Sequence, residues 1–295
     1  MARTCCFLLA AALPLALGFT AAVLPQSLRP LGALALSAAA VSLPSAKPSR
    51  VCVEADAAAV KENVLERLEE AAASAIAERG HFALAIPGGS VLKMLEGTAP
   101  SWASETTLAF VNHKAVDVDD AAMSTQAKAN KLFLSGWVGA KVIGLGGSSD
   151  AKLEAAAYED SLRLLSSAKL PRNADGVPQF DLMLIGVGDD GHVGSLYPGR
   201  EEVLDASGRW VLPVQKASGP GSITLSLPVM SAAKQVVVAA CGVSEKYPQG
   251  KSDAMARAIE GEEDTAATFP AVATISQKKS SISDLIEEIY HGTDF

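Results

Sequence analysis

The amino-acid sequence predicts a single Rossmann-like α/β domain with a mostly parallel sheet flanked by helices. Apolar runs of Val, Leu and Ile alternate with Ala-rich helical patterns along the chain, as expected where helices join parallel strands. Hydrophobic residues make up 49% of the chain and aromatic residues only 5%, which argues against an all-β sandwich. No internal repeat and no long linker divides the part after the leader, so one domain is expected.

The first predicted element is a helix over residues 57–79, where apolar residues recur at helical spacing and Gly80 ends the pattern. A strand at 81–86 then runs into a Gly-Gly-Ser turn. Further strands are predicted at 106–116, 140–145, 180–187, 221–225 and 234–243, and further helices at 121–136, 151–168 and 251–261. Because ligand groups gather beyond the carboxyl ends of parallel strands, the polar turns after these strands are the candidate site.

The first 50 residues have the composition of a leader. The formal net charge is −8, yet the first acidic residue is Glu54, and the preceding stretch carries only basic charges: Arg3, Arg29, Lys47 and Arg50. Residues 1–22 are predicted to be a signal-like segment, 23–50 a transit-peptide-like segment, and 51–295 the mature domain. Such a two-part leader is typical of plastids that lie inside extra membranes. A secreted precursor with a pro-segment is the alternative.

Charge and cysteine usage exclude several classes of protein. The acidic balance argues against general nucleic-acid binding. Pro14 interrupts the short apolar stretch near the start, so no membrane span is expected in the mature form. After the leader only Cys52 and Cys241 remain, so neither a disulfide framework nor a structural zinc site is expected.

The stretch FDLMLIGVGDDGHVGSLYPG, residues 180–199, supports two interpretations. Residues 186–191 have the G-x-G-x-x-G spacing of a dinucleotide-binding loop. That reading needs a helix at the third glycine, but Pro198 follows closely, and Asp189 and Asp190 would face an anionic ligand. Alternatively, the glycines form a sharp polar turn that holds Asp190 beside His192. A carboxylate next to an imidazole suits a general base that acts on water, although both residues could simply lie on the surface.

A second candidate turn follows the strand at 81–86. Gly88, Gly89 and Ser90 precede a helical stretch, and backbone N–H groups at such a place can bind an anion. Many strands turn through Gly-Gly without binding anything, so the pattern alone leaves both interpretations open.

Polar residues also end the strand at 106–116. Asn112, His113 and Lys114 together are more than solvation requires, though a surface patch is the alternative. Lys216 lies in a loop rich in Gly, Pro and Ser, where a solvent-exposed lysine is common.

In order along the chain, these segments resemble the 6-phosphogluconolactonases of the family that includes glucosamine-6-phosphate isomerase/deaminase. The resemblance covers residues 57–273, and its most specific part is the G-x-G-x-D-G-H turn followed by Ser-Leu-aromatic-Pro-Gly. It favours the Asp-Gly-His turn over the dinucleotide loop. The segments IPGGS, AAAYEDSL, SITLSLPVM and VVVAACG resemble further segments of the family.

The resemblance implies hydrolysis of 6-phospho-D-glucono-1,5-lactone without metal or nucleotide cofactor. It implies that His192 is the base that activates water, with Asp190 as its neighbour. It also implies that the Gly-Gly-Ser turn and Lys216 bind phosphate, together with the strand-end residues Asn112, His113 and Lys114. A monomer or a weak homo-oligomer is expected. An isomerase/deaminase and a non-catalytic sugar-phosphate-binding protein are the alternatives.

Two departures from the family concern the phosphate site. Most members have Asp-Glu-Arg where this chain has Asn112, His113 and Lys114, and a lysine lacks the bidentate fork of an arginine. Gly221 and Ser222 replace an arginine that precedes the I-T-L strand. The resemblance therefore predicts the type of reaction, whereas these departures leave the affinity for phosphate open.

Overall fold

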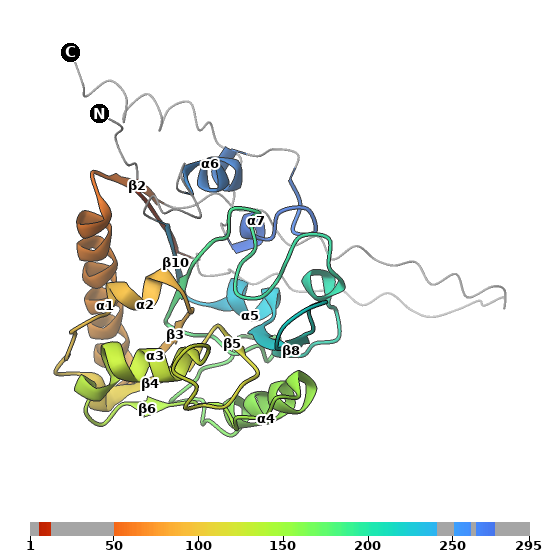
Figure 1. The fold of residues 1–295 in the computed structure, drawn as a ribbon. Helices are drawn as coiled ribbons and strands as arrows, with labels where there is room; N and C mark the ends of the chain where they lie inside the picture. The colour runs from red at the N-terminus through yellow and green to blue at the C-terminus, as the bar shows by residue number, and fades with distance from the viewer. Residues whose placement is uncertain (1–5, 13–49, 241–250, 261–263, 275–295) are drawn as a thin grey trace, which may run out of the picture.

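The computed structural model describes residues 6–12, 50–240, 251–260 and 264–274 (Figure 1). A seven-stranded sheet has the order β2-β1-β10-β7-β3-β4-β6, and a three-stranded sheet has the order β5-β9-β8. The strands of the large sheet are β2 (Arg50–Glu54), β1 (Cys6–Ala12), β10 (Gln235–Ala240), β7 (Leu182–Ile185), β3 (Phe82–Ile86), β4 (Thr106–Phe110) and β6 (Lys141–Val142). The small sheet consists of β5 (Asn112–Lys114), β9 (Ser222–Leu225) and β8 (Val211–Val214).

The five strands β10, β7, β3, β4 and β6 are parallel neighbours. From β3 the chain adds β4 and then β6 on one side, and then returns to add β7 and β10 on the other. This reversal of direction makes the gap between the carboxyl ends of β3 and β7 the topological switch point, where doubly wound sheets bind their ligands. The predicted α/β fold with a mostly parallel sheet is confirmed.

The sheet is buried on both faces by two separate apolar clusters. Along β3, Phe82, Leu84 and Ile86 belong to one cluster, whereas Ala83 and Ala85 belong to the other. Because successive side chains of a strand point to opposite faces, a strand covered on both faces is apolar throughout. This explains why the strands read as continuous apolar runs in the sequence.

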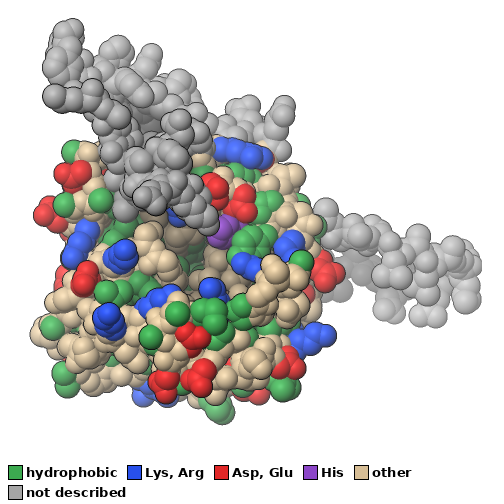
Figure 2. Space-filling model, viewed as in Figure 1, with side chains coloured by type: hydrophobic (Ala, Val, Ile, Leu, Met, Phe, Trp, Pro, Cys, Tyr) green, Lys and Arg blue, Asp and Glu red, His purple; other side chains and the backbone are tan. Residues whose placement is uncertain are grey.

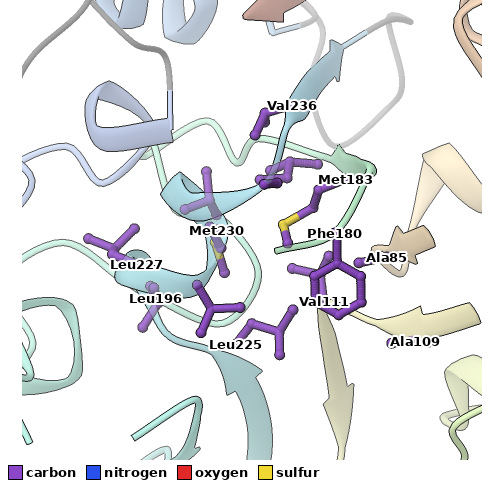
Figure 3. Packing of buried hydrophobic residues seen from close by; sticks show 14 of the residues in the cluster. Ala85, Ala109, Val111, Phe180, Met183, Leu196, Leu225, Leu227, Met230 and Val236 are labelled. Atoms are coloured by element: carbon purple, nitrogen blue, oxygen red, sulfur yellow. The ribbon is translucent and has the colours of Figure 1, made fainter. Parts of the chain in front are cut away.

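The first cluster packs under helices α1 (Ala57–Arg79), α2 (Ser90–Met94) and α3 (Thr125–Leu132). The second is covered by α4 (Ala151–Arg163), α5 (Leu227–Ala232), α6 (Ser252–Glu260) and α7 (Ala271–Thr274), together with the small sheet. Figure 3 shows side chains from β3, β4, β7, β9, α5 and β10 meeting in this second cluster. Three short 3₁₀ helices, η1 (Ala103–Glu105), η2 (Leu134–Gly136) and η3 (Glu201–Leu204), complete the described elements. None of the described helices is long and apolar enough to cross a membrane.

The predicted strand at 106–116 is divided between the two sheets. Val111 donates its N–H to the carbonyl of Ile86 at 2.8 Å, and its own carbonyl accepts the N–H of Leu225 at 2.8 Å. The chain therefore passes at Val111 from β4, beside β3, to β5, which pairs with β9. The sequence did not indicate this passage, because the apolar run continues across it.

Several predicted boundaries also differ. The helix predicted at 121–136 is shorter, because the Ser124 side chain accepts the N–H of Ala127 and starts α3 at Thr125. The helix predicted at 151–168 ends at Arg163. Residues 241–243 of the last predicted strand lie outside the described residues.

The leader is described only in part. Cys6–Ala12, within the predicted signal-like segment, forms β1 between β10 and β2 and is antiparallel to both. Residues 13–49 lie outside the described part of the chain. The division into signal-like and transit-like segments stays a prediction.

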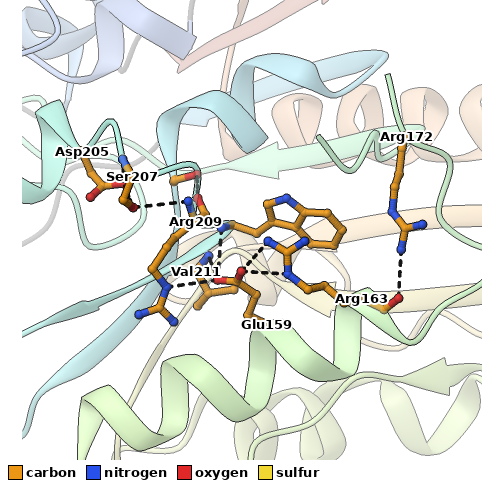
Figure 4. Close-up of polar contacts among 9 residues, drawn as sticks. Glu159, Arg163, Arg172, Asp205, Ser207, Arg209 and Val211 are labelled. Carbon is orange, nitrogen blue, oxygen red and sulfur yellow. Dashed lines mark hydrogen bonds and ion pairs between the residues drawn. The ribbon is translucent and has the colours of Figure 1, made fainter. Parts of the chain in front are cut away.

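Helix α4 is fastened to the small sheet through Glu159 (Figure 4). Its carboxylate pairs with Arg163 at 2.6 Å and accepts the backbone N–H groups of Trp210 and Val211 at 3.1 and 3.2 Å. Burial raises the pKa of Glu159, but the hydrogen bonds from Arg163 and Val211 outweigh it, so the net pKa is lowered. The ionised carboxylate thus satisfies two N–H groups that would otherwise be buried without partners.

We expect Glu159→Ala to lower the free energy of unfolding by about 3 kcal/mol, because it leaves these N–H groups and Arg163 without their acceptor. Urea denaturation followed by circular dichroism measures the change. Asp160→Ala is the matched control, since Asp160 is the exposed neighbour on the same helix and its replacement should change stability by less than about 0.5 kcal/mol. Equal effects of the two substitutions would contradict this role of Glu159.

Candidate active site

A cavity of about 260 Å³ opens at the switch point. It lies beyond the carboxyl ends of β3 and β7, as the topology predicts. In Figure 2, Lys and Arg side chains gather around a hollow in this face, with a histidine at its edge. The lining residues are Pro87, Gly88, Gly89, Ser90, Leu92, Asn112, Lys114, Met123, Thr125, Lys128, Gly186, Val187, His192, Gly194, Tyr197 and Lys251. Among the described residues that line it, none carries a carboxylate.

The turn after β7 holds Asp190 and His192 in direct contact. Asp190 Oδ1 accepts the backbone N–H of His192 at 3.0 Å and lies 2.6 Å from the imidazole Nδ1. A proton on Nδ1 that is donated to the carboxylate leaves Nε2 as the acceptor of the neutral ring. A Cβ at Gly188 would lie 2.1 Å from Nδ1. Glycine at this position therefore makes room for the histidine.

A segment near the end of the described chain supports this turn from behind. The N–H of Ala271 donates to the carbonyl of Gly191 at 2.9 Å, and a Cβ at Gly191 would lie 2.4 Å from the ring of Phe269. Arg257 lies 4.4 Å from the centre of the same ring and pairs with Asp264. Gly191 also has a φ of 81°, which favours glycine. No motif in the sequence indicated that residues 264–274 pack against the turn.

Tyr197 connects the histidine to Lys216. The Tyr197 ring lies 4.7 Å from the His192 ring between centroids, and its hydroxyl lies 2.5 Å from Lys216 Nζ. The ammonium also lies 4.4 Å from the centre of the tyrosine ring. Lys216 does not line the cavity itself. It contacts the wall of the cavity through Tyr197, which the sequence analysis did not single out.

Asn112 ties together the two turns that face the cavity. Its side-chain Oδ1 accepts the N–H of Gly88 at 3.4 Å, and its Nδ2 donates to the carbonyl of Gly194 at 3.1 Å. It also lies 3.3 Å from Ser195 Oγ. The amide thus uses both its acceptor and its donor to hold the turn after β3 against the turn after β7.

His113 does not line the cavity. Its side chain is buried, Nδ1 lies 2.7 Å from the carbonyl of Lys114, and Nε2 lies 3.1 Å from the N–H of Gln126. Both ring nitrogens therefore have partners inside the protein. The structure places Asn112 and Lys114 at the cavity and turns His113 inward, as expected for alternate residues of a strand.

The turn after β3 offers unused backbone donors. Gly89 has a φ of 78° at the start of α2, and no side chain caps this short helix. In the described part of the chain, the N–H groups of Gly89 and Ser90 have no hydrogen-bond acceptor. Lys114 and Lys128 line the same cavity. These groups together suit an anionic ligand.

Four described cavity residues with polar side chains were not singled out from the sequence: Thr125, Lys128, Tyr197 and Lys251. Lys128 lies on a predicted helix, where nothing in the spacing distinguishes it from a solvent-exposed lysine. Lys251 donates to the carbonyl of Val187, a contact between segments far apart in the sequence.

Gly221, which with Ser222 stands where the family has an arginine, is closely surrounded by other side chains. A Cβ at Gly221 would lie 2.8 Å from the Ala151 side chain and 2.9 Å from the Gln215 side chain. Ser222 is buried and pairs with Lys114 across the small sheet. Helix α4 thus occupies the space that a longer side chain at Gly221 would need.

The contact between Asp190 and His192 has a measurable consequence. Burial raises the pKa of Asp190, but hydrogen bonds from the His192 backbone and ring outweigh it, so the net pKa is lowered. The ionised carboxylate therefore stabilises the fold above its unfolded pKa, and this contribution disappears as the pH falls through the folded pKa.

We expect a carbon-13 NMR titration to show Asp190 ionising below the ordinary aspartate range, and to show a higher pKa for Asp190 in His192→Ala, which removes the ring donor. Asp264 is the internal control, because Arg257 lowers its pKa and remains in the variant. If the pKa of Asp190 is the same in both proteins, the ring does not stabilise the carboxylate.

Fold and site together define an α/β protein that presents a carboxylate-held imidazole and a lysine-lined cavity at the switch point of a doubly wound sheet. The family described as glucosamine-6-phosphate isomerases/6-phosphogluconolactonase matches residues 55–283. This match spans well over half of the chain, and the chain therefore belongs to that family.

Several curated relatives are named as 6-phosphogluconolactonases. The chain is 32% identical over 180 residues to "Probable 6-phosphogluconolactonase 2" of Arabidopsis thaliana, covering 56% of this chain and 69% of the relative. It is 32% identical over 210 residues to the 6-phosphogluconolactonase of Rattus norvegicus, covering 66% and 75%. It is also 32% identical to "6-phosphogluconolactonase 3, chloroplastic" of Arabidopsis thaliana, and this match spans 62% of the chain and 57% of the relative.

Solved structures share the fold. A 6-phosphogluconolactonase from Shewanella baltica superposes with a TM-score of 0.60 at 22% identity, covering 76% of this chain and 91% of the other. The enzyme of that name from Trypanosoma brucei superposes with a TM-score of 0.56 at 17% identity, covering 74% and 89%.

Proposed function

We propose that the protein hydrolyses 6-phospho-D-glucono-1,5-lactone to 6-phospho-D-gluconate, a step of the oxidative pentose phosphate pathway. The observation that carries the proposal is the contact between Asp190 and His192 at a cavity whose described lining contains lysines and no carboxylate. A positioned base and a cationic lining are what hydrolysis of an anionic lactone requires. Family membership and the names of the relatives support the same reaction.

The reaction needs one base and no further co-reactant besides water. Nε2 of the neutral His192 ring accepts a proton from a water molecule, whose oxygen forms a bond with the lactone carbonyl carbon. Asp190 stabilises the imidazolium that results, and the cationic lining favours the negative charge on the carbonyl oxygen. When the bond between this carbon and the ring oxygen breaks, the imidazolium returns the proton to the ring oxygen, which becomes a hydroxyl.

Asn112 favours hydrolysis over aldose–ketose isomerisation. Proton transfer between sugar carbons needs a base at the substrate carbons, and the amide of Asn112 cannot accept a proton in this way. Its groups are also occupied by Gly88 and Gly194. Measured turnover separates the lactonase from a non-catalytic sugar-phosphate-binding protein.

We further propose that the phosphate is bound by Gly88, Gly89, Ser90 and Lys114. Gly89 and Ser90 have backbone N–H groups without a described acceptor, and Lys114 lines the same cavity. Lys216 contributes from the outer side of Tyr197, whose hydroxyl it contacts. We propose that the protein acts as a monomer or a weak homo-oligomer.

We expect His192→Ala to lower the rate of lactone hydrolysis by about 10²–10⁴-fold, the usual contribution of a positioned base. Binding of 6-phosphogluconate should stay largely intact, because the Gly-Gly-Ser turn is unchanged. The measurement is steady-state hydrolysis, corrected for spontaneous opening of the lactone, with calorimetric titration of the product.

Asp190→Asn is the companion variant. It should lower the rate of lactone hydrolysis less than His192→Ala does, because it keeps the base and loses only the charge that stabilises the imidazolium. A folded His192→Ala protein that binds 6-phosphogluconate and hydrolyses the lactone at the wild-type rate would exclude His192 as the base.

Localisation in a plastid is a separate proposal. It is supported by the absence of acidic residues before Glu54 and by the chloroplastic relative from Arabidopsis thaliana. We propose that residues 1–50 are a two-part targeting leader.

We expect a fluorescent reporter fused behind residues 1–50 to enter the plastid of an alga whose plastid lies inside extra membranes. The same fusion with residues 1–22 deleted should stay in the cytosol, because the signal-like segment gives entry to the secretory route. Secretion of the full fusion would support the alternative of a secreted precursor, and cytosolic retention would exclude both.

A further inference from the structure

Lys128 lies on the face of α3 that borders the cavity, although no motif marked it. The first residue of α3, Thr125, is buried, and a Cβ at Gly88 would lie 3.3 Å from its hydroxyl oxygen. Residues three apart on a helix lie on the same face, and Thr125 and Lys128 both line the cavity. The Lys128 side chain therefore reaches the cavity from the side of the Gly-Gly-Ser turn.

Lys114 and Lys128 are both exposed. Within the described ranges neither takes part in an ion pair, and no described residue of the cavity lining carries a carboxylate. Two ammonium groups on one small cavity repel each other unless an anion lies between them. A phosphate monoester carries close to two negative charges at neutral pH, which matches the two lysines.

The other two lysines of this region have different surroundings. Lys216 bonds to the Tyr197 hydroxyl, and Lys251 donates to the carbonyl of Val187 beside the histidine turn. Lys114 and Lys128 instead lie on β5 and α3, and both elements approach the turn after β3 at Gly88, β5 through Asn112 and α3 through Thr125.

His113 fixes these two elements relative to each other. Its Nδ1 donates to the carbonyl of Lys114, and its Nε2 accepts the N–H of Gln126 in the first turn of α3. Burial and the Lys128 charge lower the pKa of His113, the Lys114 carbonyl and Glu154 raise it, and the net effect is a lowering. Because Nδ1 donates to a carbonyl and Nε2 accepts an N–H, the ring is neutral in this arrangement and connects two cationic segments without adding a third charge.

We propose that Lys128 is a phosphate-binding residue, and that the phosphate of the substrate lies between Lys114 and Lys128 above the Gly88–Gly89 turn, with His113 holding the two lysine-bearing segments together. This inference rests on the proposed sugar-phosphate substrate. In it, Lys128 provides a positive charge in place of the arginine that Gly221 and Ser222 replace. His113 is a positioning residue and not a ligand.

The test compares Lys128→Ala with Lys131→Ala. Lys131 lies one turn further along α3, is exposed and does not line the cavity, so its loss controls for a change in overall charge. Calorimetric titration with 6-phosphogluconate should show binding at least about tenfold weaker in Lys128→Ala, as for loss of a charge-assisted contact. Lys131→Ala should bind as the wild type, and Lys128→Arg should keep most of the affinity.

Steady-state kinetics give the second readout. Lys128→Ala should reduce the preference for the phosphorylated lactone over unphosphorylated glucono-1,5-lactone by about the same factor as the binding loss. A structural role for Lys128 would lower activity on both lactones alike and would leave this preference unchanged.

The outcomes separate this inference from the proposed function. If Lys128→Ala binds 6-phosphogluconate as tightly as the wild type, Lys128 is not a phosphate ligand, whatever the lactonase rate. If the wild type binds 6-phosphogluconate but hydrolyses no lactone, the proposed reaction is wrong and the binding comparison still decides the role of Lys128. If the wild type binds 6-phosphogluconate no better than gluconate, the phosphate site is wrong and so is this inference.

Discussion

The reversal of strand order at β3 is the constraint on which the site depends. Since β7 returns to the free side of β3, the turns that follow these two strands open side by side at one edge of the sheet. One turn contributes unbonded backbone N–H groups, and the other contributes the imidazole and its carboxylate. Under the proposed function, one turn binds the phosphate and the other acts on the lactone, so the site needs both turns.

A second constraint is the passage of the chain from the large sheet to the small one. Val111 belongs to both hydrogen-bond networks, so the residues immediately after it project over the carboxyl ends of the parallel strands. Asn112 then joins both turns, Lys114 faces the cavity, and His113 binds α3 from the inside. Three consecutive residues thus have three different tasks, which the alternation of side chains along a strand makes possible.

Rigid support and cationic charge are distributed differently around this cavity. The histidine turn is held by the Phe269 ring, by the N–H of Ala271 and by glycines that leave no room for a side chain. Lys114 and Lys128 are exposed, and a lysine carries its charge on a flexible four-carbon chain that can adjust to an anion. In the proposed reaction the lactone carbonyl must be placed accurately beside His192, whereas the phosphate has only to be attracted by the lysines.

The sequence by itself determined much of the fold and the proximity of Asp190 to His192 in the turn after β7. Helix α1 has the predicted bounds, and the apolar runs of β3, β7 and β10 indicated a sheet buried on both faces, because local periodicity reflects burial directly. The Asp-Gly-His turn was also readable, since its residues are neighbours in the chain. Only the tertiary structure decided which lysines reach the cavity, that His113 points inward and that Phe269 supports the turn. These depend on contacts between segments far apart in sequence, and a lysine that binds an anion has the same local pattern as one that faces solvent.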